Sequence, residues 1–163
     1  MKDIFKTPKE SAIETRYLVM PENTNHYKTV FGGVIMSWID IAAAMVAEKH
    51  CRHEAVTVSI DSISFLAPAY IGDHIIIKAS VNYVGNTSME IGVVVFKENP
   101  LTGEILKTTS AYLTFVGLDK DKKPVKIPKI LPQTDDEKRR YKDAELRMKS
   151  RIELHKKIKE KNM

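Results

Sequence analysis

A single carboxylate stands within an apolar stretch in the first third of the chain. Residues 31–44 read FGGVIMSWIDIAAA, and Asp40 is the only charged residue among them. A carboxylate in such a setting can act as a general base or as a nucleophile. The glycines Gly32 and Gly33 let a ligand approach the backbone, and free N–H groups at a helix start can hold an oxyanion. These residue types predict a hydrolytic pair.

The element that must position Asp40 is a helix over residues 32–50, about 28 Å long at 1.5 Å per residue. At about 100° per residue, one side carries an apolar stripe that should pack on a sheet: Ile35, Trp38, Ile39, Ala42, Met45 and Val46. Asp40 falls nearly opposite, among small residues: Gly33, Ser37, Ala44 and Ala47. An ordinary exposed face carries Lys and Glu, so we expect a second copy or a substrate to cover this one. A purely structural Asp40, satisfied by local hydrogen bonds or solvent, remains the alternative.

Segments rich in β-branched residues predict the sheet on which this helix packs. A short strand at residues 11–20 ends at Pro21, because proline cannot donate to a strand ladder. Long strands follow at 56–66, 74–84, 89–98 and 105–118, with short turns between the last three. Short turns favour an antiparallel meander. One long helix against one curved sheet predicts a two-layer α+β domain over residues 11–118.

The composition changes after Leu118. Residues 119–134 contain three prolines and predict an extended connector, and residues 135–163 predict a charged helix that begins at Asp135. Its narrow apolar stripe predicts packing onto its own domain or onto a sister chain: Tyr141, Ala144, Met148, Ile152 and His155.

Composition narrows the function classes. The net charge of +5 comes largely from basic runs in the last third, where interleaved acids indicate a solvated helix. No zinc-finger spacing, RNA-recognition motif or helix-turn-helix pattern is present, so we expect no nucleic-acid partner. No apolar run reaches the ~18 residues that span a bilayer, so we expect no membrane insertion. Residues 1–10 lack the apolar core of a signal peptide, which favours a cytoplasmic protein.

Cysteine and histidine often take part in catalysis or metal binding, but in this sequence neither residue type indicates such a role. Cys51 is the only cysteine, which excludes an intramolecular disulfide and suits a reducing compartment. Beside Arg52 at a helix end, it is not the nucleophile that we favour. The five histidines lack zinc-ligand spacing, so we expect no metal and no cofactor, and a surface position for His26 beside Asn25.

An ordered set of motifs resembles the hotdog-fold acyl-CoA thioesterases, in particular the bacterial acyl-CoA hydrolases and the cytosolic long-chain acyl-CoA hydrolases. The motifs span about residues 11 to 118: P-x-x-x-N at 21–25, FGG at 31–33, MSWID at 36–40, VTVSIDSISF at 56–65, IGD at 71–73 and NTSME at 86–90. The resemblance implies a long central helix wrapped by a curved antiparallel sheet. It also implies a homo-oligomer built of dimers, assembled as a trimer of dimers, with active sites between protomers.

The resemblance also implies roles for individual residues. Asp40 matches the catalytic acid, and Asn25 matches a catalytic loop asparagine that the facing protomer contributes. Gly33, preceded by Gly32, lies where a backbone N–H can meet the thioester carbonyl. Thr57 and the turn at Asn86, Thr87 and Ser88 match positions near the groove that binds coenzyme A (CoA). CoA is then part of the substrate and not a cofactor.

One position departs from the family pattern. Relatives often carry N-x-x-G after the loop asparagine, whereas this chain has Asn25-His26-Tyr27-Lys28. A stiffer or differently shaped loop is expected to change the preference for the acyl chain more than the reaction.

Three other functions fit the same motifs. A non-catalytic acyl-CoA-binding regulator would need a DNA-binding element, and only about ten residues precede the first expected strand. A hotdog dehydratase would need a histidine in the central helix, which this helix lacks between Gly32 and Lys49. A structural subunit held together by the charged helix would show neither activity nor CoA binding.

Overall fold

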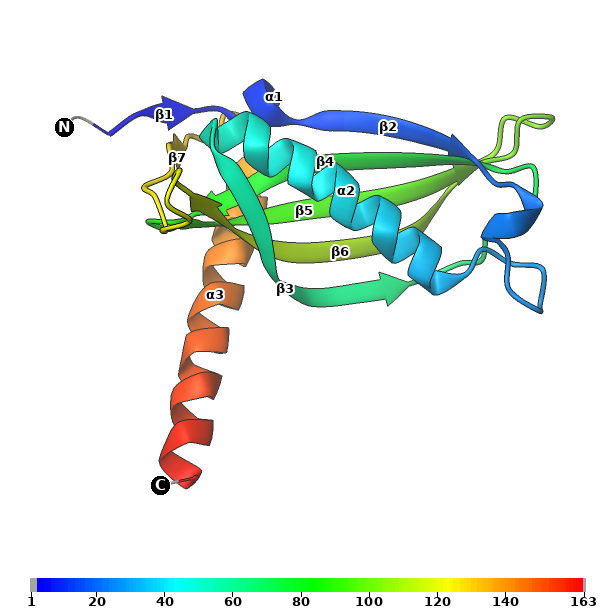
Figure 1. The fold of residues 1–163 in the computed structure, drawn as a ribbon. Helices are drawn as coiled ribbons and strands as arrows, with labels where there is room; N and C mark the ends of the chain where they lie inside the picture. The colour runs from blue at the N-terminus through cyan, green and yellow to red at the C-terminus, as the bar shows by residue number, and fades with distance from the viewer. Residues whose placement is uncertain (1–2, 163) are drawn as a thin grey trace.

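A five-stranded antiparallel sheet curls around one long helix in the computed structural model, which describes residues 3–162 (Figure 1). The strand order is β2-β4-β5-β6-β3. The elements are β2 (Ile13–Leu18), α2 (Gly32–Cys51), β3 (Glu54–Phe65), β4 (His74–Val84), β5 (Ser88–Glu98) and β6 (Ile105–Leu118). The α+β hotdog architecture predicted from the sequence is present, and β4, β5 and β6 form the predicted meander.

Short elements that the sequence analysis did not predict lie at the two ends of the sheet (Figure 1). β1 (Phe5–Lys6) pairs in parallel with β7 (Lys129–Ile130), so part of the connector is a strand. α1 (Pro8–Ser11) and the 3-10 helix η1 (Pro21–Asn23) flank β2. The buried side chain of His50 joins α1 to the segment before β7, since Ser11 Oγ donates to its Nδ1 at 3.3 Å and its Nε2 donates to the Pro128 carbonyl at 2.8 Å.

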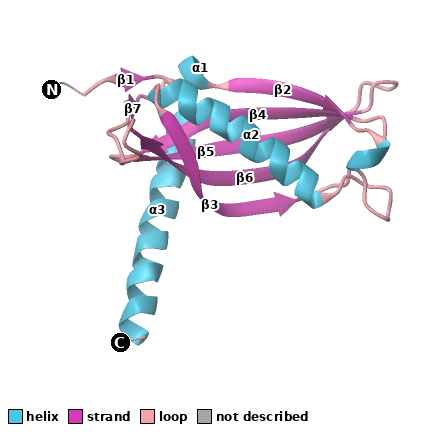
Figure 2. Ribbon diagram, in the orientation of Figure 1, coloured by secondary structure: helices cyan, strands magenta, loops and turns pink. Residues whose placement is uncertain are grey.

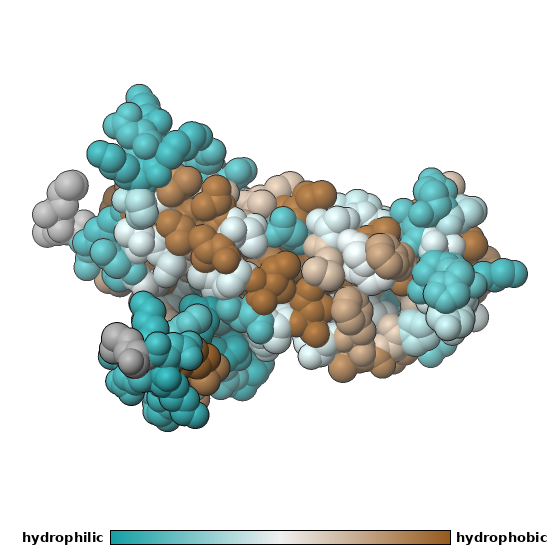
Figure 3. Space-filling model, turned by 60° about the horizontal axis from the view of Figure 1, so that its bottom comes forward, coloured by the Kyte–Doolittle hydropathy of each residue, from teal (hydrophilic) through white to brown (hydrophobic). Residues whose placement is uncertain are grey.

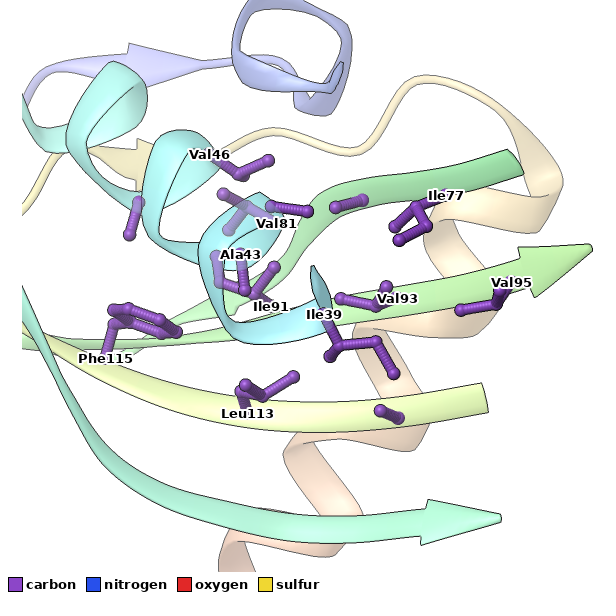
Figure 4. Close-up of a cluster of buried hydrophobic side chains, with 14 of the residues drawn as sticks. Ile39, Ala43, Val46, Ile77, Val81, Ile91, Val93, Val95, Leu113 and Phe115 are labelled. Atoms are coloured by element: carbon purple, nitrogen blue, oxygen red, sulfur yellow. The ribbon is translucent and has the colours of Figure 1, made fainter. Parts of the chain in front are cut away.

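The core lies between α2 and the concave face of the sheet (Figure 4). The largest fully buried side chains there include Ile39, Ile77, Ile91, Leu113 and Phe115. The buried side of α2 differs from the predicted stripe: Met45 is 42% exposed, whereas Ala43 and Ala47 are completely buried. A helical wheel assumes a flat partner, but this sheet curls around the helix, and alanines let its strands approach closely. Asp40 therefore lies beside the buried face, toward the edge strand β3, and not opposite it.

Along β4, alternate side chains face the core from Ile75 to Val81, and the alternation then breaks. The pairing of β4 with β5 shifts register between Val81 and Tyr83. Tyr83 packs instead against Tyr141 of α3 (Asp135–Lys161), with ring centroids 5.0 Å apart. An extra residue in a strand reverses the face of the residues that follow it, which accounts for the outward position of Tyr83.

Helix α3 begins at the predicted residue and crosses the outer face of the sheet. Thr134 caps it through a capping box with Glu137, and its acidic first turn suits the positive end of the helix dipole. Ala144 is buried, but Ile152 is exposed, so only the first half of the predicted stripe packs on this domain. Beyond Arg151 every described residue is exposed, and the helix projects away from the sheet (Figure 2). Within residues 3–162, no helix has the length and apolarity needed to cross a membrane.

Candidate functional site

The structure brings Asp40 and Thr57 into direct contact. Thr57 Oγ1 on the edge strand β3 donates a hydrogen bond of 2.8 Å to Asp40 Oδ1. Asp40 is half-buried on α2, so one carboxylate oxygen is oriented by the protein while the group stays accessible. A carboxylate held this way can take a proton from water or attack a carbonyl carbon.

The start of α2 presents backbone donors. Phe31 precedes the helix without capping it through its side chain, and its carbonyl accepts from the N–H groups of Val34 and Ile35. Within residues 3–162, no protein acceptor is recorded for the N–H groups of Gly32 and Gly33. A Cβ on Gly33 would lie 2.5 Å from an atom of the exposed Phe31 ring, so a larger residue there would require that ring to move. Two such N–H groups can stabilise a developing oxyanion.

A pocket of about 350 Å³ opens beside Gly32. Much of its lining is apolar, and Val30, Ile35, Phe65 and Leu66 contribute to it. The pocket lies between the start of α2 and the end of β3, so an apolar chain placed in it would begin next to the free N–H groups. Its size is within the range of small-molecule sites.

Asn25 lies in a tight loop that folds back onto the helix start. Thr24 bridges to Val30, and the Asn25 side-chain oxygen accepts from the backbone N–H groups of Tyr27 and Thr29 at 2.9 and 3.3 Å. Lys28 adopts the left-handed conformation, with φ 62°. This is the glycine position of the N-x-x-G pattern that the sequence was compared with, so the loop keeps a glycine-like backbone with a lysine in it. His26 is exposed, as expected.

The predicted site residues do not all meet within one chain. Asp40 lies eight residues after Gly32, about 12 Å along the helix axis. Asn25 and the glycines gather at the start of α2, whereas Asp40 and Thr57 lie at its middle. The turn of Asn86, Thr87 and Ser88 joins β4 to β5 at the other end of the sheet, near the end of α2 (Figure 1). One protomer therefore holds three separate parts of the predicted site.

The structure also shows the surroundings of Cys51, of the possible metal ligands and of two aromatic residues near the glycines. Cys51 is buried, and that burial raises the pKa of its thiol, which disfavours the reactive thiolate. No group of three or more His, Cys, Asp or Glu that could hold a metal ion occurs in the described part of the chain. Residues that the sequence analysis did not single out are Phe31, which covers Gly33, and Phe65, which lies 3.5 Å from a Cβ placed on Gly32. Phe31 begins the FGG motif and Phe65 ends the motif at 56–65. These positions within the motifs were the sequence signal that could have identified both residues.

Comparison with known proteins agrees with the fold and with the motifs. Residues 27–104 match the Thioesterase superfamily. An acyl-CoA thioester hydrolase of Bacillus subtilis, YkhA, itself uncharacterized, is 43% identical over 129 residues, which cover 79% of this chain and 75% of that protein. The cytosolic acyl coenzyme A thioester hydrolase of Rattus norvegicus is 34% identical over 145 residues, but this chain spans only 38% of it.

Solved structures resemble nearly the whole chain. A hexameric acyl-CoA thioesterase superposes with a TM-score of 0.91 at 39% identity, covering 93% of this chain and 97% of that one. A Staphylococcus aureus acyl-CoA hydrolase variant, with an asparagine replaced by alanine and CoA bound, gives a TM-score of 0.92 at 35% identity, covering 98% and 96%. Variants of the same enzyme with an aspartate or a threonine replaced by alanine are also known. The chain belongs to the acyl-CoA thioester hydrolases of the Thioesterase superfamily.

Proposed function

We propose that this chain hydrolyses fatty acyl-CoA to a free fatty acid and CoA, with Asp40 as the catalytic carboxylate. The observation that carries the proposal is the hydrogen bond from Thr57 to Asp40, which orients a half-buried carboxylate on the central helix. The variants of the Staphylococcus aureus enzyme lend support. Their asparagine, aspartate and threonine are separated by 15 and 17 positions, as Asn25, Asp40 and Thr57 are here.

Asp40 has two possible roles that give the same products. As a general base, it takes a proton from water while the water oxygen attacks the thioester carbonyl carbon. As a nucleophile, it attacks that carbon itself and forms an anhydride that water then hydrolyses. In both routes the carbon–sulfur bond breaks and CoA leaves as a thiolate that gains a proton. The N–H of Gly33 would hold the oxyanion, and Asn25 would orient the water or the thioester.

The proposed site forms between two protomers. Because Gly33 and Asp40 lie about 10 Å apart along one helix, they cannot both contact one carbonyl carbon from the same chain. We place the Asn25 loop and Gly33 of one protomer opposite Asp40 and Thr57 of its partner. The exposed side of α2 and the adjoining strand β3 carry apolar side chains that a partner would cover (Figure 3). Ile41 and Val58, 51% and 54% exposed, belong to this surface.

The rest of the substrate would extend to either side of the reacting carbonyl. The acyl chain enters the pocket beside Gly32, and the turn of Asn86, Thr87 and Ser88 contacts CoA. No cofactor or metal takes part. We further propose that three dimers assemble into a hexamer, as in the hexameric relative, and that the enzyme works in the cytoplasm.

The test measures free thiol released from a fatty acyl-CoA with a thiol-reactive dye. Asp40→Asn should lower kcat by a factor of at least about 10² while the circular dichroism spectrum stays unchanged. Wild-type activity in Asp40→Asn would contradict the catalytic assignment. Tight CoA binding by the wild-type chain without thiol release would instead indicate the acyl-CoA-binding regulator.

A further inference from the structure

The strand that carries Thr57 is irregular. The pairing of β3 with β6 shifts register twice, and the extra residues are Val58 and Asp61. Thr57 and Asp61 are four positions apart, which would place both side chains on one face of a regular strand. Thr57 instead donates to Asp40 of α2, while Asp61 contacts α3 on the outer face of the sheet. The irregularity thus turns Thr57 toward the site, as β-bulges beside active sites commonly do.

The side chain of Asp61 links the irregular part of β3 to the neighbouring strand β6 and to helix α3. Its Oδ1 accepts from Ser59 Oγ at 2.8 Å and from an Nη of Arg151 at 2.6 Å, and its Oδ2 accepts from Thr114 Oγ1 of β6 at 2.8 Å. The same Arg151 nitrogen also donates to Thr114 Oγ1 at 3.0 Å. The Asp61 side chain is only 16% exposed. Burial opposes its ionisation, but the hydrogen bonds from Arg151, Ser59 and Thr114 outweigh that effect and lower its pKa.

Arg151 is the last described residue of α3 that is not exposed. All described residues after it are exposed, whereas its own side chain is 34% exposed. A second ion pair lies one turn earlier, where Arg147 contacts Glu90 of β5 at 2.7 Å and stacks 3.7 Å above the Tyr112 ring. β5 is a central strand that carries no proposed site residue after Ser88. The two arginines therefore attach the same helix, but only Arg151 reaches the strand of Thr57.

We propose that Arg151 is a positioning residue for hydrolysis: through Asp61 it holds the irregular part of β3 in the conformation that aims Thr57 at Asp40. The C-terminal helix then acts on the site from the opposite face of the sheet. This inference rests on the proposed function, because it requires that the Thr57–Asp40 hydrogen bond supports catalysis. A displacement of about 1 Å at a catalytic group can lower a rate substantially.

The experiment compares kcat and KM of four single variants in the full-length protein. Arg151→Met keeps an unbranched apolar stem and removes the charged guanidinium, and we expect kcat to fall roughly tenfold with KM nearly unchanged. Arg151→Lys should recover much of that loss. Arg147→Met should lower the thermal midpoint at least as far while kcat stays within about twofold of wild type. Lys149→Met, whose charge pairs among the described residues only with Glu145 of the same helix, should change neither quantity.

A double-mutant cycle with Thr57→Val separates the possible failures. If Arg151 acts through Thr57, Arg151→Met should lower kcat little further once Thr57→Val is present. Equal kcat losses in Arg147→Met and Arg151→Met would mean that α3 contributes stability only, and would overturn the inference. Independent, multiplying losses in the cycle would also overturn it. Wild-type activity in Thr57→Val would instead refute the role of Thr57 in the proposed function.

Discussion

At the scale of single residues, the asparagine loop depends on an unusual backbone. Lys28 has φ 62°, a conformation that costs a residue with a Cβ roughly 1–2 kcal/mol. The side-chain oxygen of Asn25 accepts hydrogen bonds from two backbone N–H groups of its own loop. The side-chain amide N–H groups of Asn25 can therefore face a substrate. A strained residue next to a proposed catalytic residue is therefore a natural site for mutation.

Replacing Lys28 with glycine should raise the free energy of unfolding by up to about 1 kcal/mol, because glycine adopts positive φ without strain. The measurement is denaturant unfolding of wild type and Lys28→Gly. Lys28→Ala removes the same charge and keeps the strain, so it serves as the control. A gain of equal size in Lys28→Ala would show that charge, and not backbone strain, is responsible.

His50 makes stability depend on pH. It is completely buried, and desolvation lowers its pKa from the ordinary value of 6.5. The unfolded chain then binds a proton that the folded chain does not, so this contribution is complete above pH 6.5 and is lost as the pH falls below it. Denaturant unfolding between pH 7.5 and 5.5 should show a steeper loss for wild type than for His50→Gln. Parallel pH profiles would contradict the assignment to His50.

At the scale of elements, α3 is attached to the sheet by charges more than by apolar packing. Ala144 is its only fully buried residue among those described, whereas Glu90, with an 8% exposed fraction, receives two hydrogen bonds from Arg147. Removing one partner of a buried pair leaves the other unpaired in an apolar setting, at a cost of ~3–5 kcal/mol when burial is complete.

Arg147→Met should therefore lower the free energy of unfolding by roughly 2 kcal/mol, since Arg147 itself keeps some solvent contact. Denaturant unfolding measures this change. Lys157→Met is a matched control, because within residues 3–162 the Lys157 ammonium pairs only with Glu153 on the exposed end of the same helix. A loss as large in Lys157→Met would mean that the exposed end of α3 makes contacts that one chain does not show.

At the scale of the whole molecule, periodicity predicted the helix and the strands, because each packs one face on a single core. It failed where the fold bends: the curl of the sheet buries Ala47 and exposes Met45, and a shifted register turns Tyr83 outward. Arg151 and Asp61 are 90 positions apart in the sequence, so no local sequence pattern predicts their contact. The motifs named Asp40, Asn25 and Gly33 as candidate site residues, and the resemblance placed Asn25 on the facing protomer, but the expected pairing of Asp40 with the glycines does not occur within one chain.

Because one chain holds the proposed site residues apart, the central claim is that the active site forms between two protomers. Mixed dimers test this claim most directly. Asn25→Ala and Asp40→Asn subunits, each expected to be nearly inactive alone, are co-expressed with different tags or refolded together. Each mixed dimer then contains one intact site, so random pairing should restore about a quarter of the wild-type activity. Each variant refolded with itself provides the control. Activity that stays at the level of the separate variants would show that Asn25 and Asp40 act within one protomer.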